Sequence, residues 1–164
     1  MALPFSFLRD VIGLGLRPEI QRLWDSSKVR LEALAPMIER KAREHGVSPA
    51  LVAGIIVRES GARPEAIGPE FNASGDTAQG LMQVIPSNLE RLGIPRSQWH
   101  DPEVNVEAGL QILTGPPTPY GKEDTDSVLA DYGGFETEDP SEYIRDIYGL
   151  ATSSVRELGI RAMP

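Results

Sequence analysis

The sequence of 164 residues contains no cysteine. This absence excludes structural disulfides, thiolate zinc sites, iron–sulfur clusters and cysteine nucleophiles, so packing must stabilise the fold. Histidine is scarce too, because His45 and His100 are the two in the chain, and neither has a paired ligand spacing around it. The short Gly13-Leu14-Gly15 sequence lacks the third glycine of a nucleotide-binding loop. We therefore expect no metal and no cofactor.

Long apolar runs and an excess of positive charge are also missing. No stretch approaches 18 uninterrupted apolar residues, so we expect no membrane-spanning helix. The first residues have no basic region before an apolar run, and we expect no secretory signal and synthesis in the cytoplasm. The formal net charge of −8 disfavours sequence-independent binding to nucleic acid or to anionic membranes.

Helix signals dominate what is present. A capping residue precedes a proline at Ser48-Pro49, Asp101-Pro102 and Asp139-Pro140, and Ser87 and Glu90 have the spacing of a capping box. Apolar periodicity predicts helices over 34–44 and from Pro49 through Glu59, which together form a helical hairpin. Only the apolar piece 81–85 suits a strand or hairpin edge. The sequence therefore predicts a mainly α fold with long loops at 61–80 and 114–126.

Two further segments differ in composition from the rest. Apolar residues at three- and four-residue steps from Phe5 to Leu23 predict an amphipathic helix, interrupted near Gly13, Gly15 and Pro18, that packs on the core. Between residues 123 and 142 eight acidic side chains occur with no basic one, and no calcium-loop spacing accompanies them. We interpret this second segment as a solvated acidic loop.

One carboxylate falls on a predicted apolar face. Glu59 shares an arc of about 100° with Val52, Ile55 and Ile56 when residues advance as in a helix. Burial and the negative end of the helix dipole both favour its neutral form and raise its pKa, which suits a proton donor. The alternative is a structural ion pair with Arg58 or Arg63, and periodicity does not separate the two interpretations.

Three ordered blocks surround this glutamate: 58–61 (RESG), 78–86 (AQGLMQVIP) and 101–105 (DPEVN), with Gly109 and Leu113 beyond. Together they resemble the catalytic domain of soluble lytic transglycosylases, in the superfamily that includes goose-type lysozymes, over about residues 34–151. The resemblance implies a mainly α, lysozyme-like single domain with at most a very short β-hairpin. We expect 34–164 to form this catalytic domain and 1–33 to be a helical extension packed on it.

The resemblance also implies roles for individual residues. Glu59 is the catalytic acid and base, Ser60 supports it, and Met82 and Gln83 line the sugar site. The other residues expected on the substrate side are Gly80, Leu81, Asn105, Tyr132 and Tyr143. For several of these, simpler roles remain open: a plain turn for Gly80, core packing for Met82 and Gln83, a buried hydrogen bond for Asn105, and packing alone for Tyr143.

Two features depart from the family pattern. Members usually carry Ala-Tyr-Asn-Ala-Gly near the end of a helix, whereas residues 131–135 read DYGGF. Tyr132 is retained and could direct its hydroxyl toward Glu59 or the sugar, but Gly133 stands at the asparagine position. The segment 61–79 is longer than the family loop, and it contains Ser74 and a possible second acid, Asp76.

The resemblance predicts a peptidoglycan lytic transglycosylase that cleaves between MurNAc and GlcNAc, with Glu59 as acid and then base, and leaves 1,6-anhydroMurNAc ends. A hydrolytic goose-type lysozyme using Glu59 with Asp76 is one alternative, and a noncatalytic peptidoglycan-binding module is another. A cell-wall motif without an export signal favours a phage-type lysin. Such a lysin would be released through a partner holin or carried in a virion, and would act on the cell wall.

Overall fold

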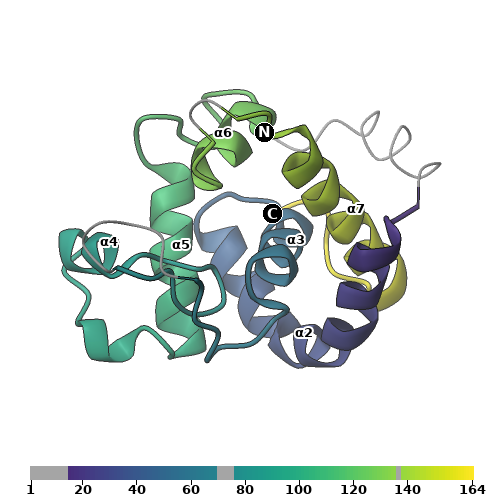
Figure 1. The fold of residues 1–164 in the computed structure, drawn as a ribbon, viewed down its shortest axis with the longest axis horizontal. Coiled ribbons are helices and arrows are strands. Elements are labelled where there is room, and N and C mark those ends of the chain that lie inside the picture. The colour runs from purple at the N-terminus through teal and green to yellow at the C-terminus, as the bar shows by residue number, and fades with distance from the viewer. Residues whose placement is uncertain (1–14, 70–75, 136–137) are drawn as a thin grey trace.

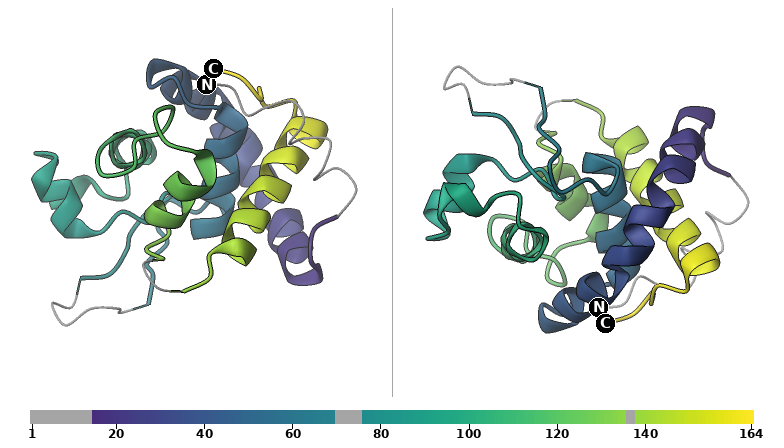
Figure 2. Two further views of the ribbon diagram at one scale, coloured as in Figure 1. Left: turned by 90° about the horizontal axis from the view of Figure 1, so that it is seen from above. Right: turned by 90° about the horizontal axis from the view of Figure 1, so that it is seen from below.

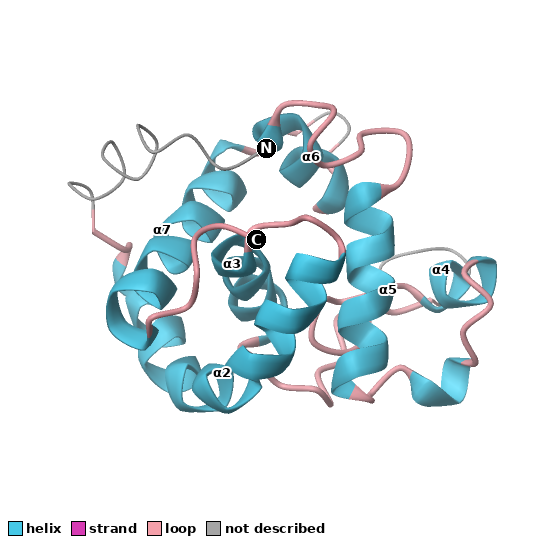
Figure 3. Cartoon of the chain, turned by 180° about the vertical axis from the view of Figure 1, so that it is seen from behind, coloured by secondary structure: helices cyan, strands magenta, loops and turns pink. Residues whose placement is uncertain are grey.

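A computed structural model describes residues 15–69, 76–135 and 138–164. Within these ranges the chain is helical, with isolated β-bridges but no strand, so the expectation of a mainly α fold is confirmed (Figures 1 and 3). No helix in the same ranges combines the length and hydropathy needed to cross a membrane. The helices are α2 (Pro18–Glu44), α3 (Pro49–Ser60), α4 (Pro86–Arg91), α5 (Pro102–Thr114), α6 (Thr125–Tyr132) and α7 (Ser141–Leu158), with a 3-10 turn, η1 (Arg96–Gln98).

Helix α3 is the centre of the domain. Its residues from Pro49 to Val57 are all buried, because the sequence PALVAGIIV offers no polar face to solvent. Figure 2 shows α7 on one side of α3 and α5 on the other, while α2 runs past α3 from the side of α7 to the side of α5. Helix α7 approaches especially closely at Gly54, where a Cβ atom would lie 2.5 Å from the carbonyl oxygen of Ile147. This contact fixes the position of α7 relative to the C-terminal end of α3.

Two of the expected helix caps are confirmed, and two need correction. The Ser48 side chain accepts a hydrogen bond from the backbone N–H of Leu51, and the Asp101 side chain accepts one from Val104. Asp139 stands one residue further out than expected: it accepts from the N–H of Ser141, and Pro140 occupies the cap position of α7.

The prediction of a capping box at Ser87 is wrong. Helix α4 begins at Pro86, its cap position is Ile85, and no side chain caps it. The carboxylate of Glu90 is instead 2.6 Å from Nε of Arg96, so it forms an ion pair with η1. Pro86 suits the first helical position because its fixed φ matches a helix and its missing N–H would have no partner inside the helix.

Helix α2 is longer than the predicted 34–44 helix, because it runs unbroken from Pro18 to Glu44. Pro36 lies inside it on an exposed face, where water can replace the hydrogen bond that the ring removes. The boundary expected between 33 and 34 therefore falls within one helix. The predicted helical periodicity before residue 15 lies outside the described residues.

The acidic segment 123–142 contains helix α6, where the sequence predicts a solvated loop. Asp124 accepts a hydrogen bond from the N–H of Ser127 and so caps α6, and Asp126 accepts one from the hydroxyl of Tyr148 on α7 at 2.5 Å. The acidic side chains are thus used for capping and for helix contact. Helix α6 brings Tyr132, its last residue, toward the end of α3.

The segment between α3 and α4 is held by isolated antiparallel bridges, Ile67 to Gln79 and Gln79 to Val84, in the part that the structure describes. This pairing fits the expected short hairpin, although residues 81–85 do not form a strand. Ser74 lies outside the described residues. The bridges bring Gly68 and Gln83 to the same place beside the end of α3.

Candidate active site

Glu59 lies in the last turn of α3, just before Gly61 ends the helix with a left-handed φ of +60°. A groove of about 370 Å³ opens there, between the end of α3, the bridged segment and the end of α6. Among its described lining residues, Glu59 is the one with a carboxylate. The lining consists of Arg58, Glu59, Gly68, Pro69, Ala78, Gln83, Val84, Ile85, Asn88, Ile112, Tyr132, Gly133 and Gly134.

The environment of the Glu59 carboxyl favours its neutral form. Burial raises the pKa of Glu59, and this effect outweighs the hydrogen bond from Tyr143 and the charge of Arg58, which both lower it. The side chain as a whole is half-buried, so it remains reachable from the groove. A carboxylic acid in this setting keeps its proton to a higher pH than a free glutamate and can give it to a bound group.

Tyr143, in the first turns of α7, is the direct partner of Glu59. Its hydroxyl donates a hydrogen bond to Oε1 of Glu59. Burial raises the pKa of Tyr143 well above its ordinary value, so the phenol stays protonated and remains a donor. The ring of Phe135 packs at 5.2 Å from the ring of Tyr143. Tyr143 is not among the residues that line the groove, so it acts there through its packing on Phe135 and its hydrogen bond to Glu59.

The hydroxyl of Tyr132 points neither toward Glu59 nor toward the expected sugar site. It donates to the backbone oxygen of Met82 at 2.7 Å. The ring nevertheless forms part of the groove wall. Burial raises its pKa well above the usual value, with the nearby Glu59 acting in the same direction.

Gly133 has a packing reason of its own. A Cβ atom there would lie 2.8 Å from Cε1 of Tyr143 and 2.7 Å from Cε2 of Phe135. Those two rings occupy the space into which a larger residue would project. The departure from the family's asparagine is therefore matched by the packing of Phe135 on Tyr143, the residue that binds Glu59.

The block at 80–83 divides between core and groove. Leu81 and Met82 are fully buried, and Met82 packs so tightly on α5 that a Cβ at Gly109 would lie 2.4 Å from its sulfur. Gln83 lines the groove, and its Nε2 donates to the backbone oxygens of Ala66 and Gly80. Of the predicted pair Met82 and Gln83, the structure brings only Gln83 to the groove.

Asn105 and Ser60 hold this block in place. Oδ1 of Asn105 accepts from the N–H of Met82 at 2.8 Å, while Nδ2 donates to the oxygens of Gln79 and Trp99, both at 2.9 Å. The expected buried hydrogen bond of Asn105 is thus confirmed. The Ser60 hydroxyl lies 2.8 Å from the oxygen of Leu81, which ties the end of α3 to the block.

Gly80 sits in the same cluster, with φ of +81° and no room for a side chain. A Cβ there would lie 2.3 Å from Nδ2 of Asn105. Gly80 therefore permits the close approach of Asn105, and it does not line the groove. The positive φ also fits the turn that we had left open for this glycine.

Asp76 is not among the residues that line the groove. Its Oδ1 lies 3.8 Å from Nη1 of Arg96, next to the 3-10 turn. Nor do the described ranges contain a group of three His, Cys, Asp or Glu residues that could hold a metal ion. Among the residues that the structure describes, the proton chemistry at the groove thus rests on Glu59 and the tyrosines around it.

Sequence reasoning missed the partner of Arg58. Its Nε donates to Oδ2 of Asp146 on α7 at 3.2 Å, and its Cζ lies 5.3 Å from the centre of the Tyr143 ring. Arg63 donates instead to the backbone oxygen of Ser60. Asp146 follows Tyr143 by three residues, so both lie on one face of α7, and that spacing was the available signal.

This arrangement defines a class of protein: a lysozyme-like helical domain that presents a half-buried glutamic acid at the side of a groove. Residues 36–137 match the family described as the transglycosylase SLT domain. The chain therefore belongs to the transglycosylase SLT domain family.

Curated relatives share the matched region. The transglycosylase of Enterobacteria phage PRD1 is 33% identical over 91 residues, covering 56% of this chain and 31% of that protein. The membrane-bound lytic murein transglycosylase C of Actinobacillus succinogenes is 32% identical over 103 residues, covering 57% of this chain and 27% of that protein. The protein of the same description from Haemophilus influenzae is 33% identical over 95 residues, covering 52% and 25%. The chain thus spans less than a third of each relative's length.

Proposed function

We propose that the chain is a peptidoglycan lytic transglycosylase that cleaves the β-1,4 bond between MurNAc and GlcNAc, with Glu59 as its general acid and then its base. The observation that carries this proposal is the Glu59 carboxyl at the groove, whose pKa is raised by burial and which accepts a hydrogen bond from Tyr143. Membership of the transglycosylase SLT domain family and the names of the relatives support it.

In the first step, protonated Glu59 gives its proton to the glycosidic oxygen as the bond to the anomeric carbon breaks. The 2-acetamido oxygen of MurNAc stabilises the positive charge that develops on this carbon. Glu59 is left as a carboxylate, and the hydroxyl of Tyr143 donates to it. Because this hydrogen bond lowers the pKa of Glu59, it stabilises the ionised form that the step produces.

In the second step, the Glu59 carboxylate takes the proton of the MurNAc 6-hydroxyl while that oxygen bonds to the anomeric carbon. The product is a 1,6-anhydro sugar, Glu59 regains its proton, and no water is consumed. Gln83, on the groove wall, offers an amide for contact with the glycan. We assign Ser60, Gly80, Leu81, Met82, Asn105 and Tyr132 to holding the groove wall in shape.

Hydrolysis is the main chemical alternative, and it usually requires a second carboxylate near the bond. Asp76 was the candidate, and its position beside Arg96 outside the groove lining favours the internal reaction. Mass spectrometry of digested peptidoglycan decides between the two reactions. We expect anhydro muropeptides, whereas products one water heavier would overturn the transglycosylase assignment.

A noncatalytic binding module is tested by zymography of the unsubstituted protein beside Glu59→Gln. Clearing by the first protein alone supports the proposal. Equal clearing by both, or clearing by neither while both bind the sacculus, would indicate a binding role. Glu59→Gln keeps the size and shape of the side chain, so a loss of clearing with binding retained reports on proton transfer.

We propose that the protein acts as a phage-type lysin on the cell wall, reaching it through a partner holin or as part of a virion. A phage protein among the relatives supports this assignment. Sequencing of the genomic neighbourhood tests it. Adjacent holin or virion genes are expected, and a gene set among bacterial secretion or division genes would count against it.

We also propose that residues 34–164 are the catalytic unit and that 1–33 are an added layer. The family match begins at residue 36, and Trp24 is buried, with Nε1 donating to Glu157 at 3.0 Å. Deletion of 1–33 should lower the melting temperature yet leave detectable cleavage. Complete loss of folding would show that the layer is integral.

A further inference from the structure

The cation nearest in sequence to the proposed acid does not pair with it. Arg58 and Glu59 are adjacent on α3 and line the same groove. The hydrogen bond of Arg58 goes to Asp146, and its guanidinium carbon lies 5.3 Å from the centre of the Tyr143 ring. An opposite charge within about 4 to 6 Å of a carboxyl lowers its pKa by about 1 to 3 units. The distance of the Arg58 guanidinium from Glu59 therefore affects the pKa of Glu59.

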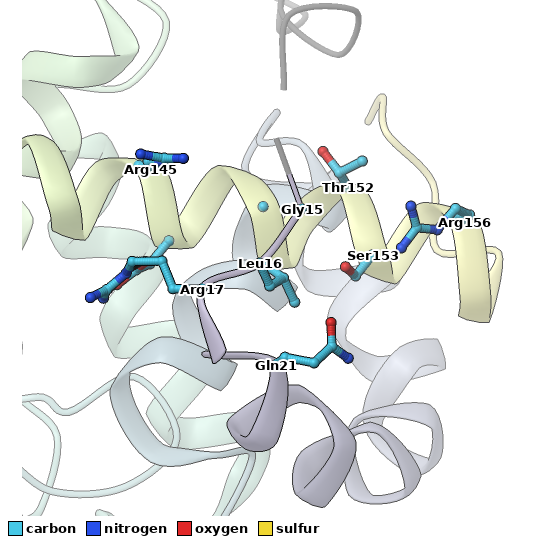
Figure 4. A pocket seen from close by; sticks show the side chains of 10 residues that line it. Gly15, Leu16, Arg17, Gln21, Arg145, Thr152, Ser153 and Arg156 are labelled. Carbon is cyan, nitrogen blue, oxygen red and sulfur yellow. Dashed lines mark hydrogen bonds and ion pairs between the residues drawn. The ribbon is translucent and has the colours of Figure 1, made fainter. Parts of the chain in front are cut away.

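Asp146 is a fixed acceptor for Arg58. Its side chain is 2% exposed, and Arg17 donates to both of its oxygens, from Nε at 3.0 Å and from Nη2 at 2.7 Å. Figure 4 shows Arg17 and Leu16, which precede α2, beside α7. A buried carboxylate bound from two sides in this way has little freedom to turn. Arg58 thus meets an acceptor whose position is set by the segment that precedes the family match.

We propose that Asp146, fixed by Arg17, is a positioning residue that holds the Arg58 guanidinium over the Tyr143 ring and away from a direct ion pair with Glu59. The inference rests on the proposed role of Glu59 as the acid. Within residues 15–69, 76–135 and 138–164, the titratable groups that face Glu59 are Arg58 from α3, Tyr132 from α6 and Tyr143 from α7. The two tyrosines stay neutral, so among the described groups the charge that acts on Glu59 is that of Arg58.

The decisive experiment is an NMR titration of the Glu59 side chain in Asp146→Asn, in Arg58→Gln and in the double variant. Release of Arg58 in Asp146→Asn should move the titration midpoint of Glu59 down by about one pH unit or more. Arg58→Gln should leave the midpoint unchanged or raise it, because the positive charge is gone. The double variant should titrate like Arg58→Gln.

Glu142→Gln is the matched control. Glu142 lies on the same helix and 3.2 Å from Arg17, but no contact joins it to Arg58 among the described residues. This control loses the same unit of negative charge as Asp146→Asn, so it should leave the Glu59 midpoint in place. An unchanged midpoint in folded Asp146→Asn, or an equal fall in the double variant, would overturn the proposal.

A measurement on the unsubstituted protein covers the case in which Asp146→Asn does not fold. The Hε proton of Arg58 should exchange slowly, and its δ protons should show contacts with the Tyr143 ring and an upfield shift. An Arg58 signal that behaves like free arginine would refute the positioning role. These readouts do not depend on cleavage, so they stand even if Glu59→Gln retains activity and the proposed function fails.

If both proposals hold, the pH profile of cleavage links them. The high-pH limb, where the acid loses its proton, should move down in Asp146→Asn by the same amount as the Glu59 midpoint. A merely structural defect would lower the rate at every pH without moving this limb. In the double variant, the added Arg58→Gln change should return the high-pH limb to its original position. A packing defect caused by Asp146→Asn would not be repaired in this way.

Discussion

The phenol of Tyr143 donates a hydrogen bond to the carboxyl of Glu59 across 84 positions of sequence. One group lies at the end of α3 and the other at the start of α7. Their meeting depends on the close contact of these helices at Gly54. The first two predictions concern this pair.

Replacing Glu59 by Gln should reduce glycan cleavage by about 100-fold or more, because an amide cannot donate the acid's proton. The same change should raise the melting temperature at pH 7. Burial raises the pKa of folded Glu59, so its ionisation destabilises the fold as pH rises from about 4.5, and glutamine carries no such penalty. Turbidity loss of purified sacculi and thermal unfolding are the two measurements. Activity within a few-fold of the unsubstituted protein would remove Glu59 from the chemistry.

Tyr143→Phe should raise the pKa of Glu59, because the lost hydrogen bond favours the ionised form. The high-pH limb of the cleavage profile should therefore move to higher pH, while the maximal rate falls. Tyr148→Phe is the matched control. It also removes a phenol hydroxyl from α7, but this hydroxyl binds Asp126 and not Glu59. Movement of the limb in the control as well would point to a general effect of α7.

Gly133→Asn restores the residue usual in the family, yet it should harm this protein. The new side chain would meet the rings of Tyr143 and Phe135, since even a Cβ would lie 2.8 and 2.7 Å from them. We expect a loss of about 1 to 3 kcal/mol in the free energy of unfolding, together with slower cleavage. Denaturant titration and the sacculus assay measure these effects. Full stability would mean that the aromatic pair moves aside freely.

A fourth prediction concerns stability in acid, away from the groove. Burial opposes ionisation of Glu107, but hydrogen bonds from Gln111, His45 and Lys41 lower its pKa to about 2. The stability that this carboxylate provides is present above the unfolded pKa of 4.5 and is lost as pH falls toward about 2. Glu107→Gln should therefore flatten the fall in melting temperature between these values. An identical slope in both proteins would contradict the assignment.

The sequence predicted correctly those helix starts at which a side chain caps the first turn. Ser48 and Asp101 cap their helices as expected, and the periodicity around Glu59 placed that carboxyl at a half-buried position with a raised pKa. Ser87 failed because Pro86 had already begun the helix. A capping pattern predicts a helix start only when no better first residue precedes it.

Contacts between distant segments were beyond local reasoning. Helix α6 was missed because its acidic start reads as a solvated loop, whereas Asp126 is held by Tyr148 from α7. The hydroxyl of Tyr132 binds a backbone oxygen, and that acceptor is set by how Met82 packs on Gly109. The Arg58–Asp146 contact likewise depends on how α7 lies on α3. Such pairings follow from tertiary packing, which periodicity does not encode.

The absence of a side chain at Gly54 has a consequence for engineering. The backbones of α3 and α7 touch at Gly54, so a methyl group there would push the two helices apart. These helices carry Glu59 and Tyr143. The distance between Glu59 and Tyr143, and with it the pKa of Glu59, would then change although Gly54 does not line the groove. Variation at Gly54 therefore offers a way to alter the acidity of Glu59 while leaving every groove-lining residue unchanged.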